Sequence, residues 1–541
     1  MRSRFARPLA AVTAALSLVA LAACGGSGGG SGSGSDPASS GSKTLSVAWT
    51  STPPQLDPNV FTGLTWVYAS DAYMATLLKY DTSVPEDEVI GVKALEPSLA
   101  ESFTANADET EYTFVLRKGV MSPYGNEMTA DDVVYTFERM LSNPKSLQAG
   151  VLLPTANVDK TRPVEKVDDY TVKYHLTKPS AVALSILAYP ILGILDSTEV
   201  KKHATPQDPY AGEWMKNNAA SFGAYKVANL VPGQEMRFDR NPNYFGEQPY
   251  FENIVLKAVP DGSARSQLLI SGDVDIISEP PIDQLKKIED SDAARVSEQA
   301  DSNRHNLSVN VQDPALSKPL VRHAISHAID REALVQAVYQ GYAAPALTPQ
   351  SSVLREDQPK VGGYDPELAK KELAQAGYPS GLDVALSFNS ARPGPFAETL
   401  GRLIQADLKE VGINATLNAV PTIADFEAAV TNKSLPAYLY TERPAQPDIA
   451  YGMYLYLFGK SALNKSGYTN PELDALVTQA LGLVPGAERD DAIEKALKII
   501  AEDEPIISLV EVPDLAGVAQ DIQGFRALPS GGVRFQELSR G

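Results

Sequence analysis

Three charged side chains, Glu442, Arg443 and Asp448, lie close together after an apolar segment that is predicted to be a β-strand. Ligands of open α/β sheets bind beyond the carboxyl ends of strands, so this segment is a candidate ligand site. Buried charges must be paired with one another or with a ligand. We expect Arg443 either to offer its bidentate fork to a ligand carboxylate or to pair with Glu442 at the surface. Tyr451 and Tyr454 follow, and they could line the same pocket or pack into the core.

Cys24 is the sole cysteine of the sequence, and its position predicts covalent attachment of lipid. Three arginines near the start precede an apolar stretch and then Leu21-Ala22-Ala23. A basic start, a short apolar run and small residues before a cleavage point are typical of an export signal. The cysteine lies where a bacterial lipoprotein signal requires it. A free N-terminal cysteine in an ordinary signal peptide is the alternative.

Two further patterns look like sites, but we predict no site at either. His323 and His327 are four residues apart, a spacing that can bind metal on a helix. No glutamate directly follows His323, so the zinc-protease pattern is absent. The segment 459–461 matches half of a phosphate-binding loop, but Tyr454 occupies the position of the first glycine. We therefore predict no catalytic residue, no metal site and no cofactor.

The composition predicts a folded, acidic protein. A hydrophobic content of 43% with interspersed charges is typical of a globular chain rather than a disordered one. The formal charge of -20 at pH 7 disfavours nucleic acid and anionic lipid surfaces as partners. The length predicts two or more domains or lobes. Since there is only one cysteine, core burial must stabilise the chain without an intrachain disulfide.

Strands and helices are predicted to alternate from Tyr364 onward, which favours βαβ units and a parallel sheet. The pairs Asp-Pro at 365–366 and Asn-Pro at 470–471 predict helix starts, because the first residue caps and proline suits the first turn. Asp330 is expected to cap a helix over 331–340 in the same way. The predicted strands cover 384–388, 413–417 and 437–441, and the predicted helices cover 395–411, 423–430 and 487–502.

Two segments upstream are also predicted to form core. Thr129 is expected to cap a helix that places Val133, Phe137 and Met140 on one face. The segment 181–195 is strongly apolar, but it is short for a membrane span and contains a proline. We interpret it as core.

A series of short motifs runs along the chain. The most specific stretches read MTADDVVYTFER over 128–139 and VRHAISHAIDREAL over 321–334. The others lie at 56–58, 95–102, 112–120, 167–172, 240–245, 271–276, 467–474 and 504–507. In type and order, these motifs resemble those of family 5 extracellular solute-binding proteins, the dipeptide-, oligopeptide- and nickel-binding group of ABC importers. The resemblance covers nearly the whole chain beyond its first segment.

The resemblance implies an α/β fold of two lobes, the class II periplasmic-binding-protein-like fold, with a ligand cleft between the lobes. The first lobe is expected to be discontinuous and to carry an extra subdomain. We place the two crossings between lobes near 301–310 and 510–515. The predicted parts are a lipoprotein signal peptide at 1–23, a Gly/Ser tether at 24–43, lobe 1 at 44–300 and 515–541 with its subdomain over about 80–200, and lobe 2 at 301–514.

Departures from the family pattern mark candidate specificity positions. Peptide-binding relatives place an aspartate for the ligand's α-amino group where this chain aligns Ala445, so Glu442 or Asp448 would have to replace it. Phe222 stands where relatives have a small residue in a segment that lines the cleft, and it could shape the pocket or fill core. Trp66 and Tyr68 could face the cleft and stack on a planar or sugar ligand, or pack within their helix.

The resemblance implies an extracytoplasmic binding lipoprotein, not an enzyme. It would capture a small ligand, a peptide or peptide-like molecule above all, and deliver it to the permease subunits of an ABC transporter. We expect a monomer that is anchored to the cell membrane through lipid on Cys24, with no nucleic-acid partner. An exported lipoprotein hydrolase and a sensor or receptor on the same scaffold are the alternatives. The sequence leaves the ligand itself open.

Overall fold

The computed structural model describes residues 43–60, 63–529 and 531–541. The predicted signal peptide, Cys24 and nearly all of the tether lie outside these residues. The described part belongs to one compact unit. Within it, no helix is both long and apolar enough to cross a membrane.

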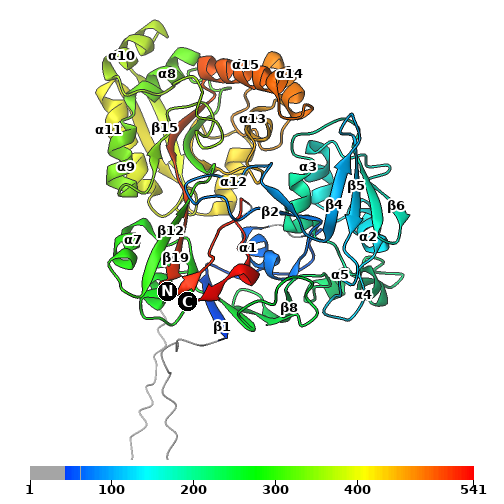
Figure 1. Cartoon of the computed structure of the whole chain (residues 1–541). Helices are drawn as coiled ribbons and strands as arrows, with labels where there is room; N and C mark the ends of the chain where they lie inside the picture. The colour runs from blue at the N-terminus through cyan, green and yellow to red at the C-terminus, as the bar shows by residue number, and fades with distance from the viewer. Residues whose placement is uncertain (1–42, 61–62, 530) are drawn as a thin grey trace, which may run out of the picture. The chain divides into compact units, whose positions relative to one another are not determined.

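The first large sheet combines parallel and antiparallel strands (Figure 1). β1 pairs in parallel with both β10 and β11, whereas β19 runs antiparallel to β11 and β12. The carboxyl ends of β1 and β11 therefore share an edge with the start of β19. In order across the described sheet, the strands are β12 (Ala294–Gln299), β19 (Asp514–Ala519), β11 (Ile276–Ser278), β1 (Thr44–Trp49), β10 (Asn253–Ala258), β9 (Glu235–Arg240) and β8 (Tyr225–Val231).

The second large sheet contains the strands that were predicted to form a parallel sheet. β15 does pair in parallel with β16 and β17, but β13 is antiparallel to both of its neighbours. The predicted parallel pairing is therefore confirmed for β15, β16 and β17, and β13, which enters from the first sheet, adds an antiparallel strand beside them. In order across the described sheet, the strands are β14 (Ala344–Pro345), β18 (Ile506–Glu511), β13 (Arg304–Val309), β17 (Ala437–Glu442), β15 (Leu382–Phe388) and β16 (Ile413–Ala419).

Two short segments join the large sheets. The chain leaves the first sheet at the end of β12 and enters the second at Arg304. It leaves the second sheet at Glu511 and re-enters the first at Asp514. Both connections run between the same two edges, since β13 starts where β17 and β18 end.

Helices flank the second sheet and share its core. α8 (Pro319–Ala328), α9 (Arg331–Tyr339), α10 (Pro366–Gln375) and α11 (Ala397–Glu410) pack against it (Figure 1). The predicted caps are confirmed: the side chains of Asp330, Asp365 and Asn470 accept N–H bonds from the first turns of α9, α10 and α14. The remaining helices of this half are α12 (Ile423–Thr431), α13 (Ile449–Leu457), α14 (Pro471–Leu481) and α15 (Ala487–Asp503).

A smaller sheet forms within residues 100–175 and is covered by α2. Val133, Phe137 and Met140 are fully buried on one face of α2, as predicted. Each such side chain contributes on the order of 1.5–3 kcal/mol through burial. The segment 181–195 is largely buried core, again as predicted. The elements are β4 (Ala100–Ala105), β5 (Glu111–Leu116), β7 (Thr171–His175), β6 (Val164–Asp168), α2 (Ala130–Ser142) and α3 (Gln148–Thr155).

The core beneath this small sheet extends to α13, α14 and α15. Apolar side chains such as Met453 and Leu497 belong to the same cluster as Phe114 and Phe137. The hydrophobic core thus joins segments on both sides of the predicted lobe boundary. The other elements are α1 (Leu64–Tyr73), α4 (Ser197–Lys202), α5 (Gly212–Met215), α6 (Gly262–Ile270), α7 (Ile282–Glu289), β2 (Leu78–Tyr80), β3 (Leu95–Pro97), β20 (Ile522–Gln523), β21 (Ser539–Arg540) and three short 3-10 helices (Ser185–Ala188, Pro190–Leu192 and Phe535–Glu537).

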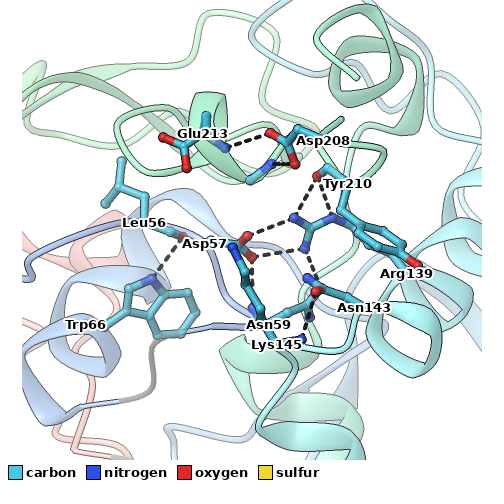
Figure 2. Close-up of polar contacts among 11 residues, drawn as sticks. Leu56, Asp57, Asn59, Trp66, Arg139, Asn143, Lys145, Asp208, Tyr210 and Glu213 are labelled. Atoms are coloured by element: carbon cyan, nitrogen blue, oxygen red, sulfur yellow. Dashed lines mark hydrogen bonds and ion pairs between the residues drawn. The ribbon is translucent and has the colours of Figure 1, made fainter. Parts of the chain in front are cut away.

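A buried polar network ties α2 to the segment after β1 (Figure 2). Arg139 donates to both carboxylate oxygens of Asp57, at 2.9 and 2.8 Å. The same guanidinium contacts the Asn59 side chain and donates to the Tyr210 carbonyl at 2.8 and 3.1 Å. Such bidentate, charge-assisted pairing satisfies a cation that has no access to water. The arginine of the motif over 128–139 is therefore structural.

Candidate functional site

The edge of the second sheet that faces the two connections carries a buried ion pair. Arg304 opens β13, and it lies opposite Glu442 at the end of β17 and Glu511 at the end of β18. Arg304 Nη2 is 3.3 Å from Glu442 Oε2, and both side chains are almost fully buried. Burial raises the pKa of Glu442, and the charge of Arg304 opposes that rise. Glu442 is therefore paired within the protein.

The edge of the first sheet carries a second group of polar and aromatic residues. Glu279 follows β11 directly and has a positive φ of 47°. Its Oε1 accepts a hydrogen bond from the Tyr68 hydroxyl at 3.2 Å. Trp49, at the end of β1, lies with its ring 5.2 Å from that of Tyr68. These three residues line a small cavity of about 30 Å³, together with Asp514.

The Arg443 side chain forms ion pairs with both segments that connect the two large sheets. Its Nε is 2.7 Å from Asp301 Oδ2, in the first connection. Its Nη2 is 2.7 Å from Asp514 Oδ2, at the end of the second connection. The backbone N–H of Arg443 donates to the Tyr456 hydroxyl at 3.1 Å. One cation on the second sheet thus holds both segments through which the chain passes between the sheets.

The electrostatics of this cluster depend on its burial. Burial raises the pKa of Asp301, and the charge of Arg443 only partly opposes the rise. Burial alone would lower the pKa of Arg443, but the two carboxylates raise it well above its ordinary value. Burial and then the charge of Glu279 raise the pKa of Tyr68 well above its ordinary value. Arg443 therefore stays charged, and its charge favours the ionised form of Asp301 against the effect of burial.

Several predicted site residues lie in other surroundings. Trp66 is fully buried, and its Nε1–H donates to the Leu56 carbonyl at 3.0 Å (Figure 2). Phe222 and Tyr451 are buried in the core that extends beneath the small sheet. Tyr454 is partly buried, with its ring 5.0 Å from that of Phe458.

Asp448 caps α13 and pairs with α15. Its Oδ1 accepts the N–H of Tyr451 at 2.9 Å, and its Oδ2 is 2.6 Å from Arg489 Nη2. Asp448 and Arg489 are both buried. Of the predicted ligand-binding residues, Arg443 and Tyr68 line small cavities next to the connections. A role in binding stays a prediction for every one of them.

The sequence prediction missed four residues of this cluster: Trp49, Glu279, Asp301 and Asp514. Their positions in the sequence could have indicated them, because each lies at the end of a strand or next to a predicted crossing between lobes. Arg443 was expected to meet Glu442 or a ligand, whereas its partners are Asp301 and Asp514.

The described residues offer no cluster of three or more metal-binding side chains. His327 Nδ1 lies 2.8 Å from Glu372 Oε2 and is thus engaged with a residue of α10.

Comparison with known proteins decides the family. Residues 94–464 match the sequence profile of bacterial extracellular solute-binding proteins, family 5. The chain belongs to this family. The sequence resemblance is thereby confirmed, and the family's proteins are solute-binding proteins rather than enzymes.

Individual relatives bind different ligands. Heme-binding protein A of Haemophilus influenzae is 27% identical over 470 residues, which cover 83% of this chain and 85% of the relative. The dipeptide-binding protein of Escherichia coli is 26% identical over 529 residues, which cover 93% of this chain and 95% of the relative. These names describe the relatives, and their variety leaves the ligand of this chain open.

Solved structures share the fold. The periplasmic binding protein DppA from Helicobacter pylori, in complex with the peptide STSA, gives a TM-score of 0.76 at 24% identity, with 92% of this chain and 98% of that chain covered. The substrate-binding protein CtaP from Listeria monocytogenes gives a TM-score of 0.81 at 22% identity, with 92% of this chain and 99% of that chain covered. The expected two-lobed periplasmic-binding-protein fold is confirmed.

Proposed function

We propose that this protein is an exported lipoprotein that captures a small ligand, a peptide or peptide-like molecule above all, between its two lobes and delivers it to an ABC transporter permease. The observation that carries the proposal is the position of Arg443. It lies where the carboxyl end of β17 meets both connections, and ligands of such folds bind beyond strand ends. Lobes joined by short connections can close around a ligand by hinge motion.

The distribution of charge supports a ligand that carries an ammonium group. The acids of segment 442–448 are neutralised internally, by Arg304 and by Arg489. Glu279 makes no ion pair with another described residue and is held by the Tyr68 hydroxyl. In peptide-binding relatives, an aspartate aligned with Ala445 pairs with the ligand's α-amino group. We assign that role to Glu279 in this protein. A carboxylate beside the rings of Trp49 and Tyr68 suits a cationic end of a ligand.

The decisive experiment is to identify the ligand and to measure closure. Mass spectrometry of ligand released from denatured protein should find a peptide or peptide-like molecule. Adding that ligand to emptied protein should lower the radius of gyration in small-angle scattering and raise the melting temperature by mass action. Glu279→Gln should weaken binding of the free-amino form by about tenfold or more, while leaving an N-acetylated form unaffected. A tight ligand that leaves the radius of gyration unchanged would rule out capture by lobe closure.

Removal of Cys24 should separate the protein from the membrane. In cells that express Cys24→Ala, the chain should be released or remain unprocessed, because the sole acceptor of lipid is gone. Membrane fractionation, followed by intact-mass measurement, checks this outcome. Ser27→Ala, in the same tether, serves as the matched control and should remain anchored. A Cys24→Ala protein that is bound to membrane at the wild-type level and mass would exclude lipid anchoring at this residue.

A further inference from the structure

A second pocket lies away from the connections between the sheets. Its volume is about 710 Å³, which is within the range of pockets that bind small molecules. Every residue that lines it falls within 71–250 or 534–539, so the second sheet contributes nothing to it. Neither Arg443 nor Glu279 lines this pocket. It is therefore separate from the site proposed for the transported ligand.

The pocket lining includes hydrogen-bond acceptors without donors. The side chain of Asp71, on α1, makes no hydrogen bond or ion pair with another described residue, and its Oδ2 is fully buried. Burial raises the pKa of Asp71 to about 7, although the charge of Arg534 opposes the rise. Oε1 of Gln536 is also buried without a partner in the described part of the chain. A buried carboxylate is costly unless a cation or several donors pair with it.

The pocket lining also includes donors. Arg117 uses its Nε to bind the Ser98 carbonyl at 2.6 Å. Its two terminal nitrogens form no hydrogen bond or ion pair among the residues that the structure describes, which leaves the guanidinium fork open. Tyr244 also lines the pocket; burial raises the pKa of its hydroxyl, and the charges of Arg534 and Arg117 oppose that rise. Such a fork fits a carboxylate with bidentate geometry.

Asp71 and Arg117 both line the pocket. Arg534 also lines the pocket, and its partner Glu537 is 3.1 Å away. Arg534 is itself neutralised by Glu537, and its side chain is only 5% exposed. The pocket lining therefore includes one acid, Asp71, and one base, Arg117, that form no ion pair with another described residue.

We propose that this pocket binds a small zwitterion of the amino-acid class with an apolar side chain. The ligand's ammonium group pairs with Asp71 and its carboxylate with Arg117. Apolar side chains that could contact the ligand's side chain also line the pocket: Met74, Ala188, Phe245 and Leu538. Occupation by such a molecule gives both charges a partner at once, which neither an amine nor a carboxylic acid alone does. The protein thus has a binding site within its first lobe that is distinct from the transport site.

The first test uses wild-type full-length protein and three matched probes in isothermal titration calorimetry. L-phenylalanine carries both charges, phenethylamine lacks the carboxylate and 3-phenylpropanoate lacks the amine. L-phenylalanine should bind about tenfold or more tightly than either of the others, because each lost charged hydrogen bond weakens binding on that scale. No saturable binding of L-phenylalanine, or equal binding of all three probes, would overturn the proposal. This comparison requires no variant to fold.

The second test locates the site. Asp71→Asn should weaken L-phenylalanine about tenfold and leave 3-phenylpropanoate unchanged. Arg117→Gln should weaken L-phenylalanine similarly and leave phenethylamine unchanged. Asp108→Asn, an exposed acid in the loop before β5, is the matched control and should alter neither. If L-phenylalanine binds both pocket variants at wild-type affinity, its site lies elsewhere and the assignment fails. Glu279→Gln should leave it unchanged, which separates this result from the transport site.

Discussion

Replacing Arg139 with methionine is expected to lower the free energy of unfolding by about 3–5 kcal/mol. The side chains of Arg139 and Asp57 are 0% and 1% exposed, so the substitution leaves a carboxylate buried with no cation. The Asn59 side chain and the Tyr210 carbonyl lose their donor as well. In urea denaturation, unfolding should begin at a lower urea concentration than in the wild type, since this network connects α2 to the segment that follows β1 (Figure 2).

A double-variant cycle separates the lost pair from lost packing. Asp57→Asn combined with Arg139→Met removes both charges, and it should recover a large part of the stability that the single variant loses. Arg162→Met is the control at an exposed ion pair, where the exposed fractions are 60% and 45%. It should change stability by less than about 1 kcal/mol. If Arg139→Met also stayed below about 1 kcal/mol, the buried pair would not be the strong contact that its geometry indicates.

Arg443→Met is expected to destabilise the protein at neutral pH by about 3 kcal/mol or more. The substitution leaves Asp301 and Asp514 close together without their cation. It should also weaken binding of the transported ligand, because the two connections lose the residue that holds them to the second sheet. Urea denaturation and calorimetry with the identified ligand measure the two effects.

The pH dependence of Arg443→Met should reveal the unpaired carboxylates. The folded-state pKa of Asp301 is already above its unfolded value, and losing Arg443 should raise it further. A raised carboxyl pKa means that the folded state binds the proton more tightly, so stability falls as pH rises between the two values. The penalty of the variant should therefore be largest above pH 7 and smaller near pH 5.

Two controls accompany the Arg443 measurements. Arg402→Met removes an exposed pair with Glu398 and should cost less than about 1 kcal/mol at either pH. Adding Asp301→Asn to Arg443→Met should flatten the pH dependence, since the titrating group is gone. A penalty that is the same at both pH values would show that lost packing, not unpaired charge, is responsible.

Local sequence determined where many elements begin and which faces they bury. Asp330 starts α9 and Asn470 starts α14, because a capping side chain and the first turn are neighbours in the chain. The apolar spacing of Val133, Phe137 and Met140 placed them correctly on the buried face of α2. The order of the motifs likewise indicated the family, which the comparisons confirmed.

Only the tertiary structure decided which charged residues meet. Glu442 and Arg443 are adjacent in sequence, yet they point to different partners: Arg304 for the first, Asp301 and Asp514 for the second. Along a strand, successive side chains point to opposite faces, so neighbours in sequence need not share surroundings. The partners come from distant strands whose order in the sheets no local pattern specifies. Local physics therefore set the caps and the buried faces, whereas sheet order set the ion pairs of the candidate site.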